Sequence, residues 1–333
     1  ATLTISAANR SKTYGQSVTF DGTTPSSDFN VVGLLNSDTV TSVALVSSGS
    51  GAAGTAPVAG SPYVITPSAA VGTGLGNYTI GYVPGTLTVN PATLTITAQP
   101  KSKTYGATIT FDQTTPSTDF TVVGLLNSDT VTSVALVSTG AAGAAPVAGS
   151  PYGITPSAAV GTGLGNYTIG YVPGTLTVNP ATLTITAQPK SKTFGSADPP
   201  LTYIVSGLQS GDTEAGVLTG ALTRAAGEAV GSYPITEGGL AVNSNYTINF
   251  TGSTLTINSA APKILSLTVV SPSQVVLVWS AVSNVTYRVQ ARPDLNAGWV
   301  NLVPDVRATN TTAAAVDNPA GAPQRFYRIL MLP

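Results

Sequence analysis

The chain of 333 residues has neither cysteine nor histidine. These absences exclude disulfides, thiolate nucleophiles and Ser-His-Asp triads, and they remove the usual ligands of zinc, copper and haem. Charged residues are also scarce, because Asp, Glu, Lys and Arg together make up 8 % of the chain. We therefore expect a protein that is not an enzyme, and we assign it no catalytic, cofactor-binding or metal-binding residue.

Two kinds of oxygen-based site remain chemically open. Paired carboxylates can hydrolyse glycosides, but the Glu residues are confined to one stretch, at Glu214, Glu228 and Glu237. Calcium could take oxygen ligands from a set of side chains that occurs twice, as Asp28, Asn36 and Asp38 and as Asp119, Asn127 and Asp129. Their spacing is not that of an EF-hand loop. Because Asp and Asn also cap turns through their own backbone, we prefer that role for them.

Long apolar runs and basic clusters are missing as well. No run approaches the roughly 20 apolar residues of a membrane-spanning helix, so we expect no membrane span. The basic residues are dispersed and the pI is about 5.3, which argues against nucleic-acid binding. Residues 1–259 carry seven Lys and Arg against eleven Asp and Glu, whereas residues 260–333 carry six against three. This polarity could steer head-to-tail contact between chains, although scattered, solvated side chains are the preferred interpretation.

The most informative feature that is present is an internal duplication. Residues 92–180 repeat residues 1–91 with thirteen substitutions and one deletion of two residues. A shorter, diverged copy begins at Ala181, and the residues after about 260 do not fit the repeat. Each copy has the size of one small β-sandwich. The sequence therefore predicts four domains, which span residues 1–91, 92–180, 181–259 and 260–333.

The pattern within each copy indicates β structure. In Thr93–Thr97 and in Gly85–Val89 apolar residues alternate with threonine, which predicts half-buried strands. Glycine and proline break the pattern at short intervals, and no segment has a helical period. We predict an all-β fold of tandem immunoglobulin-like antiparallel β-sandwiches with seven or eight strands each. Because only Asn90, Pro91 and Ala92 separate two such domains, and proline is stiff, we expect an elongated rod.

The third copy carries a specific set of motifs. It contains Lys-Thr-Phe-Gly at 192–195, Leu-Thr-Arg-Ala-Ala-Gly-Glu at 222–228 and Asn-Tyr-Thr-Ile-Asn-Phe at 245–250. The copy closely resembles the bacterial MBG repeats of the YGX type, which occur in tandem in large secreted and surface proteins. The first two copies keep Lys-Thr-Tyr-Gly, Gly-Leu-Leu-Asn-Ser-Asp and Asn-Tyr-Thr-Ile but lose the Leu-Thr-Arg-Ala-Ala-Gly-Glu segment. The resemblance implies an extracellular or cell-surface, secreted protein.

The last segment resembles a fibronectin type III module. Val-Val-Leu-Val-Trp-Ser at 275–280, Tyr-Arg-Val-Gln at 287–290 and Arg-Phe-Tyr-Arg-Ile-Leu at 325–330 resemble the B, C and F strands of that fold. Counting candidate strands gives six, and a seventh, G-type strand has no candidate. The module is either complete with six strands, which we prefer, or receives a strand from another subunit.

The second interpretation names a contact between subunits. Its donor would be the strand Thr2–Ile5, and it would join chains head to tail by β-strand addition. The residues in contact would then be Leu3, Ile5, Phe326 and Ile329.

The aromatic residues recur at matching positions of the copies. Two of these sets are Tyr14, Tyr105 and Phe194, and Tyr78, Tyr167 and Tyr246. Such regularity favours core and corner packing over a platform for sugars. Trp279 is expected in a core, whereas Trp299 could be exposed beside a loop. A spontaneous cross-link between Lys103 and Asn179 is a minor option.

Together these observations favour a non-catalytic extracellular structural protein. We expect a rigid stalk or a subunit of a bacterial surface filament, which associates with itself head to tail. The alternative is a surface adhesin that binds glycans or proteins of a host or matrix through its repeats or its terminal module. The register of Ala1, which matches that of Ala92 and Ala181, suggests a processed product.

Overall fold

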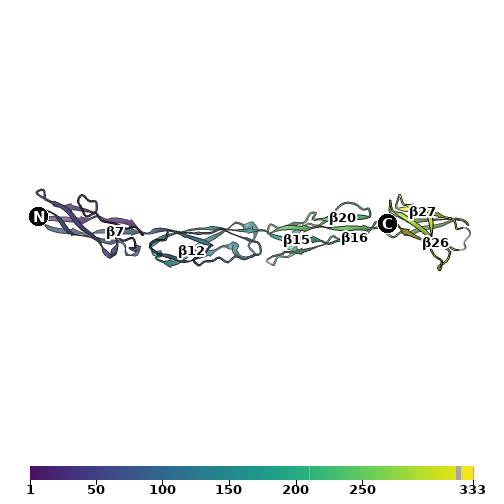
Figure 1. The fold of residues 1–333 in the computed structure, drawn as a ribbon, viewed down its shortest axis with the longest axis horizontal. Helices are drawn as coiled ribbons and strands as arrows, with labels where there is room; N and C mark the ends of the chain where they lie inside the picture. The colour runs from purple at the N-terminus through teal and green to yellow at the C-terminus, as the bar shows by residue number, and fades with distance from the viewer. Residues whose placement is uncertain (210, 320–323, 333) are drawn as a thin grey trace. The chain divides into compact units, whose positions relative to one another are not determined.

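The computed structural model describes residues 1–209, 211–319 and 324–332. Its regular structure is nearly all β, and the strands form multiple sheets, which confirms the predicted all-β class of tandem β-sandwiches (Figure 1). Contacts between residues divide the chain into two compact units, residues 1–181 and residues 182–333. Among the described residues, no helix is both long enough and apolar enough to cross a membrane.

The first repeat contributes seven strands in two sheets. One sheet has the order β3-β1-β6 and the other the order β2-β7-β5-β4. The bounds are β1 Thr2–Ala7, β2 Arg10–Thr13, β3 Phe29–Val32, β4 Thr39–Ser47, β5 Tyr63–Thr73, β6 Thr79–Val83 and β7 Gly85–Asn90. Two pairings, β1 with β6 and β2 with β7, are parallel, which the expected antiparallel sandwich did not include.

The second repeat has the same topology, as its near-identical sequence requires. Its sheets have the orders β10-β8-β13 and β11-β12-β14-β9. The bounds are β8 Ala92–Ala98, β9 Lys101–Thr104, β10 Phe120–Val123, β11 Thr130–Val137, β12 Tyr152–Thr162, β13 Tyr167–Val172 and β14 Gly174–Asn179. Short 3-10 turns punctuate both repeats: η1 Ser48–Ser50, η2 Val58–Gly60, η3 Leu75–Asn77, η4 Thr139–Ala141, η5 Val147–Gly149 and η6 Leu164–Asn166.

Alternation of threonine with apolar residues places the core of these repeats. Leu94 and Ile96 in β8 are completely buried, whereas Thr93 is exposed and Thr95 is half-buried. Burying a side chain of this size stabilises the fold by about 1.5–3 kcal/mol. One apolar cluster contains Leu87 and Val89 from the end of the first repeat together with Leu94 and Ile96 from the start of the second. The buried face therefore continues through the short junction.

The third repeat is more fragmented than the first two. Its sheets have the orders β17-β15-β22, β16-β23-β20-β19 and β18-β21. The bounds are β15 Ala181–Ala187, β16 Lys190–Thr193, β17 Tyr203–Ser206, α1 Glu214–Val217, β18 Leu218–Thr219, β19 Thr223–Arg224, β20 Gly231–Thr236, β21 Ala241–Val242, β22 Tyr246–Thr251 and β23 Ser253–Asn258. The short helix α1 was not expected from the sequence, because a single turn leaves no period to recognise.

The last segment has six described strands, the number predicted from the sequence. They are β24 Ile264–Ser271, β25 Gln274–Ser280, β26 Thr286–Arg292, β27 Val300–Arg307, β28 Thr312–Asp317 and β29 Phe326–Met331. They form two sheets, in the orders β24-β25-β28 and β27-β26-β29. Trp279 and Tyr287 are completely buried between them, with ring centroids 6.0 Å apart. Trp299 is half-buried, and the guanidinium carbons of Arg292 and Arg328 each lie 4.4 Å from its ring centroid.

Candidate functional site

The first two residues predicted to contact another subunit lie in the core of the first repeat. Leu3 and Ile5 have no exposed surface. Their strand β1 pairs with β3 along one edge and with β6 along the other. A donated Thr2–Ile5 strand would therefore have to leave two neighbours and a buried core. The structure gives β1 no free edge to add to another sheet.

The other two predicted contact residues lie on a strand at the edge of its sheet. The order β27-β26-β29 leaves one side of β29 without a strand partner among the described residues. Ile329 packs against the core of the last segment. Phe326 lies near Arg292, whose guanidinium carbon is 5.9 Å from the ring centroid. The six described strands thus leave open the position beside β29 that a seventh strand would fill.

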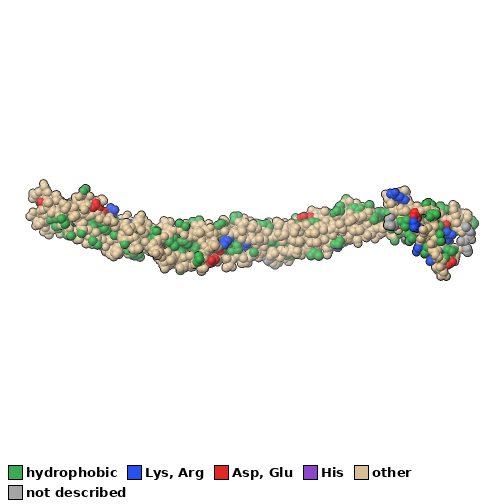
Figure 2. Space-filling model, in the orientation of Figure 1, with side chains coloured by type: hydrophobic (Ala, Val, Ile, Leu, Met, Phe, Trp, Pro, Cys, Tyr) green, Lys and Arg blue, Asp and Glu red, His purple; other side chains and the backbone are tan. Residues whose placement is uncertain are grey.

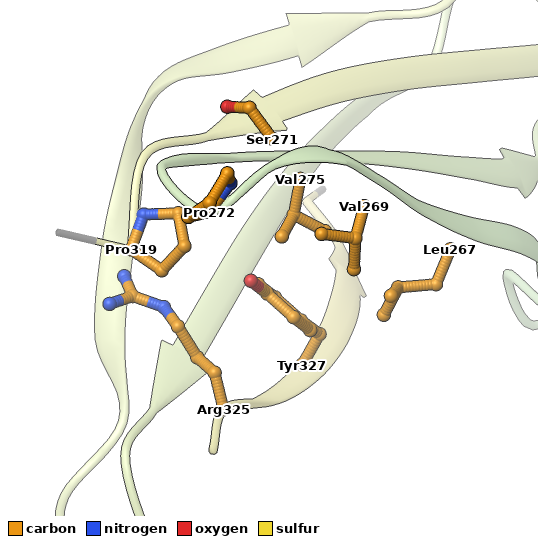
Figure 3. Close-up of a pocket in the computed structure, with 8 residues that line it drawn as sticks. All are labelled: Leu267, Val269, Ser271, Pro272, Val275, Pro319, Arg325 and Tyr327. Atoms are coloured by element: carbon orange, nitrogen blue, oxygen red, sulfur yellow. The ribbon is translucent and has the colours of Figure 1, made fainter. Parts of the chain in front are cut away.

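An apolar cavity of about 190 Å³ lies beside this edge. Figure 3 shows Leu267 and Val269 of β24 and Tyr327 of β29 gathered around one opening, with the Arg325 guanidinium near Pro319. Strand β24 is unusually exposed for an apolar strand: the exposed fractions are 54 % for Leu265, 48 % for Leu267, 65 % for Val269 and 58 % for Val270. Exposed apolar strands of this kind are typical of surfaces that bind another protein.

The charges near the cavity neutralise one another. Asp317 is buried, and its Oδ2 lies 2.6 Å from Nε of Arg325 and accepts a hydrogen bond of 2.9 Å from the Tyr327 hydroxyl. Burial, together with the neighbouring Asp317 carboxylate, raises the pKa of Tyr327 to about 12. Figure 2 shows further Lys and Arg side chains on the visible face of this segment. Because its own ion pair is internal, the cavity suits an apolar side chain better than a charged ligand.

A second candidate site joins the first repeat to the second within residues 1–181. Tyr14 belongs to the Lys-Thr-Tyr-Gly turn that follows β2, and its backbone N–H donates to the carbonyl oxygen of Asn90, 2.9 Å away. The Tyr14 hydroxyl donates to Oδ2 of Asp129 over 2.9 Å. The Tyr14 ring also meets the ring of Tyr167 edge to face, with centroids 5.5 Å apart. Tyr14 has 4 % of its surface exposed. The end of the first repeat that carries Tyr14, which we call its tail end, is therefore covered.

The surface that receives Tyr14 is built by two turns of the second repeat. The Tyr167 hydroxyl donates to the same Asp129 Oδ2 over 2.8 Å and accepts from the backbone N–H of Leu126. Asn127 and Ser128 have φ values of 53° and 65°, in the left-handed region that Asn tolerates better than most residues. Gly163 lies against Asp129, since a Cβ on Gly163 would stand 1.9 Å from Oδ1. We call the surface formed by Leu126, Asn127, Asp129, Asn166 and Tyr167 the acceptor tip.

Two further hydrogen bonds cross the same junction. The backbone N–H of Val58 donates to Oδ1 of Asn166 over 2.9 Å, and Nδ2 of Asn127 donates to the carbonyl oxygen of Gly54 over 3.0 Å. Three polar contacts and one ring contact therefore connect the repeats. The contacts at Tyr14, Gly54 and Val58 fix three points of the tail end, so the two domains are held in one orientation.

Burial and charge act on the tyrosines of this junction. Burial first, and then the hydrogen bond to Asp129, raises the pKa of Tyr167 to about 12. Burial is also the largest cause that raises the pKa of Tyr14. Both tyrosines are therefore neutral donors over the physiological pH range. The recurrence of these tyrosines in the sequence predicted core packing instead, because the pattern does not show which positions meet across a domain boundary.

The lysine of the Lys-Thr-Tyr-Gly motif is buried, which the sequence pattern did not predict. Nζ of Lys12 donates to the carbonyl oxygens of Gln16, over 3.0 Å, and of Ala53. The equivalent Lys103 donates to Ala107, over 2.9 Å, and to Ala142. Burial lowers the pKa of both lysines.

The third repeat holds its motif lysine with ion pairs instead. Nζ of Lys192 lies 2.6 Å from Oδ1 of Asp198 and also contacts Glu228. These hydrogen bonds raise the pKa of Lys192. Arg224 pairs with the same two carboxylates. The segment Leu-Thr-Arg-Ala-Ala-Gly-Glu thus supplies an ion-pair network that the first two repeats replace with backbone carbonyls.

The proposed cross-link between Lys103 and Asn179 conflicts with the register of their strands. Lys103 is paired with Val178, and both are buried, whereas Asn179 pairs with Thr104 on the exposed side. Successive side chains of a strand point to opposite faces. The Lys103 amine and the Asn179 amide are therefore on different faces of the sheet.

The oxygen ligands considered for calcium lie in separate hydrogen-bond networks. Asp28 pairs with Arg10, 2.7 Å away, and Asp119 pairs with Lys101. Asp38 accepts from the Tyr78 hydroxyl over 2.9 Å. Within residues 1–209, 211–319 and 324–332, no group of three or more acidic side chains is close enough to hold a metal ion.

These sites belong to a tandem β-sandwich protein whose first two repeats contact one another. A family comparison matches the MBG domain (YGX type) to residues 3–88, 94–177 and 183–256. The chain therefore belongs to the MBG domain (YGX type) family, and MBG-domain repeat proteins are typically extracellular.

Other comparisons add little to this assignment. No curated protein matches the chain. A crystal structure of the chicken CNTN1 FN1-FN3 domains is similar over 83 % of this chain and 78 % of that one, at 11 % identity and a TM-score of 0.15. A likeness of that size supports no argument about function.

Replacing Gly163 should separate the two repeats, whereas replacing its counterpart Gly74 should not. Ala at either position is strained by roughly 1–2 kcal/mol, because φ is +71° at Gly163 and +73° at Gly74. Each Cβ would also displace a carboxylate 1.9 Å away, Asp129 or Asp38 respectively. Of these two carboxylates, that of Asp129 accepts the Tyr14 hydroxyl. In Gly163→Ala, hydrogen exchange at the Val58 N–H should accelerate, while in Gly74→Ala it should stay slow. Equal exchange in both variants would contradict the role of Asp129.

Alkaline pH should weaken the second repeat as Tyr167 ionises. An unfolded tyrosine has a pKa near 10, and that of Tyr167 is about 12 in the fold. The folded state binds the proton more tightly, so its stabilisation is complete below about pH 10 and is lost as the pH rises towards 12. The loss is at most about 3 kcal/mol. Urea unfolding measured at stepped pH should show this loss in the free energy of unfolding. The variant Tyr167→Phe should lack the part of the pH dependence that comes from Tyr167. Titration of Tyr167 near 10, followed by its ring carbon signals, would disprove the prediction.

Proposed function

We propose that this chain is a non-catalytic structural protein of the cell exterior, in which tandem repeats are coupled end to end to form a stalk or a filament subunit. The observation that carries the proposal is the junction at which Tyr14 and Tyr167 donate to one oxygen of Asp129. A protein that needs only several independent copies of a binding domain gains nothing from such a contact. A protein that must keep a fixed distance between its two ends depends on it.

The remainder of the chain supports a structural role. Its buried polar groups are mostly satisfied within single repeats, as Lys12 and Asp28 illustrate. The lack of histidine and cysteine leaves few groups that could donate or accept protons near neutral pH. Both facts favour a role for these repeats in spacing and support.

The coupling can be tested with distances between spin labels. The chain has no cysteine, so Thr66→Cys and Thr155→Cys, at equivalent exposed positions of β5 and β12, give two unique labelling sites. We expect one narrow distance distribution. Asp129→Asn should broaden it, because the carboxylate that holds Tyr14 is lost, and the matched variant Asp38→Asn should leave it narrow. A broad distribution in the parent chain would refute a coupled stalk.

Assembly of chains into a filament is a second proposed function, and the open edge of the last segment favours it. We assign this segment to a fibronectin type III-like sandwich, because its six described strands have the orders β24-β25-β28 and β27-β26-β29 and leave the place beside β29 open. The free side of β29 and the apolar cavity beside Leu267 and Val269 would accept an extended apolar strand. Strand β1 is not the donor in this proposal, because both its edges are used within its own repeat. An adhesin that binds a peptide or glycan of a host surface at the same place is the alternative.

Substitution at the open edge separates filament assembly from adhesion. Val269→Lys puts a charge into the cavity, whereas Val270→Lys puts one on a similarly exposed neighbour that does not line it. We expect Val269→Lys alone to abolish filaments in electron micrographs of the purified protein. If the parent chain forms none at high concentration but is retained by a glycan or matrix array, the adhesin replaces the filament.

A further inference from the structure

We propose that the first repeat carries a second acceptor tip, and that it binds the tail end of another YGX-type repeat that has tyrosine at the position of Tyr14. This tip consists of Leu35, Asn36, Asp38, Asn77 and Tyr78, the counterparts of the five residues that receive Tyr14 in the second repeat. The inference rests on the proposed coupling of repeats and adds the kind of partner that this surface selects.

The tip of the first repeat already has the geometry of the occupied one. The Tyr78 hydroxyl donates to Oδ2 of Asp38 over 2.9 Å and accepts from the N–H of Leu35 over 2.8 Å. In the second repeat the matching distances, from Tyr167, are both 2.8 Å. Asn36 also has the φ value of its counterpart, 53°. The site is therefore preorganised, and binding would require little ordering of its residues.

The two tips differ in how much of their surface is exposed. Leu35 has 55 % of its surface exposed and its counterpart Leu126 has 38 %. Tyr78 is half-buried, whereas Tyr167 is only 8 % exposed. Among the described residues, Oδ2 of Asp38 receives one tyrosine hydroxyl and that of Asp129 receives two. The first tip thus presents the apolar area and the acceptor that Tyr14 occupies on the second.

The required partner chemistry follows from the occupied tip. The partner must offer an aromatic ring with a hydroxyl for Asp38, a backbone N–H for the amide oxygen of Asn77 and a backbone carbonyl for the amide nitrogen of Asn36. In the first repeat, Tyr14, Val58 and Gly54 supply these three groups to the second tip. A sugar or a nucleotide does not present a ring hydroxyl and two peptide groups in this arrangement, whereas another repeat of the same type does.

The third repeat shows what happens when the hydroxyl is missing. Phe194 occupies the position of Tyr14 there, and it lines a cavity of about 250 Å³ together with Ser280, Ala281 and Val282 of the last segment. The residues around Phe194 in this cavity include no carboxylate. Tyrosine at this position therefore fits a following repeat with an acceptor tip, and phenylalanine fits a following domain without one. This distinction excludes the tail end of the third repeat as the partner.

The test adds one repeat to the complete chain. A second copy of residues 1–91 is placed ahead of Ala1, with its tyrosine counterpart of Tyr14 facing Asp38. We expect the pKa of Tyr78, followed by its ring carbon signals, to rise towards the value of about 12 that Tyr167 has. Hydrogen exchange at the Leu35 N–H should slow at least several-fold. Both effects should disappear when the added copy carries phenylalanine in place of that tyrosine.

Three outcomes separate this inference from the proposed function. If Tyr78 and Leu35 behave alike with and without the added copy, while spin labels still show the first two repeats coupled, the second tip does not bind and the inference alone is overturned. If the spin labels show no coupling, the proposed function fails first. If Tyr78 shifts with concentration in the original chain, and Tyr14→Phe combined with Tyr105→Phe leaves that shift unchanged, a surface without the tail-end tyrosine occupies the tip and the assigned partner is wrong.

Discussion

One carboxylate oxygen, Oδ2 of Asp129, receives hydroxyls from two domains, and the organisation of the first 181 residues depends on it. The Tyr167 hydroxyl orients the carboxylate from within the second repeat, and the Tyr14 hydroxyl reaches it from the first. Hydrogen bonds to an ionised acceptor are roughly twice as strong as those between neutral groups. The chain has few charges, and one of them, the Asp129 carboxylate, lies at a domain boundary. Its hydrogen bonds fix the orientation of two domains that a short proline-containing connection joins.

The repeats differ in the partners that hold the lysine of the shared motif. The third repeat holds Lys192 with Asp198 and Glu228, whereas the first two bury their motif lysines on backbone carbonyls. A glycine- and alanine-rich loop can bring carbonyls close to a lysine because it has no bulky side chains. The same fold therefore holds the buried lysine in two ways, with carboxylates or with backbone carbonyls. Both keep the Lys-Thr-Tyr-Gly or Lys-Thr-Phe-Gly turn in place.

The sequence predicted the strands well because their period is local. The last segment has six described strands, the number predicted from the sequence, and Leu94 and Ile96 are core residues as their alternation with threonine requires. The parallel pairing of β1 with β6 was missed, because pairing depends on topology and not on the pattern of one strand. The junction was missed for the same reason: Tyr14 and Asp129 are 115 residues apart. The one signal of the junction in the sequence was that Tyr14 recurs as Tyr105 in the second repeat and is replaced by Phe194 in the third.

The central claim is that Tyr14 and Asp129 couple two domains, and a double-mutant cycle measures that coupling directly. Tyr14→Phe and Asp129→Asn are made singly and together, and the free energy of unfolding of each protein is determined. The account predicts a coupling energy of about 1–2 kcal/mol for this pair, and one near zero when Asp38→Asn takes the place of Asp129→Asn. Additive effects of Tyr14→Phe and Asp129→Asn would contradict it.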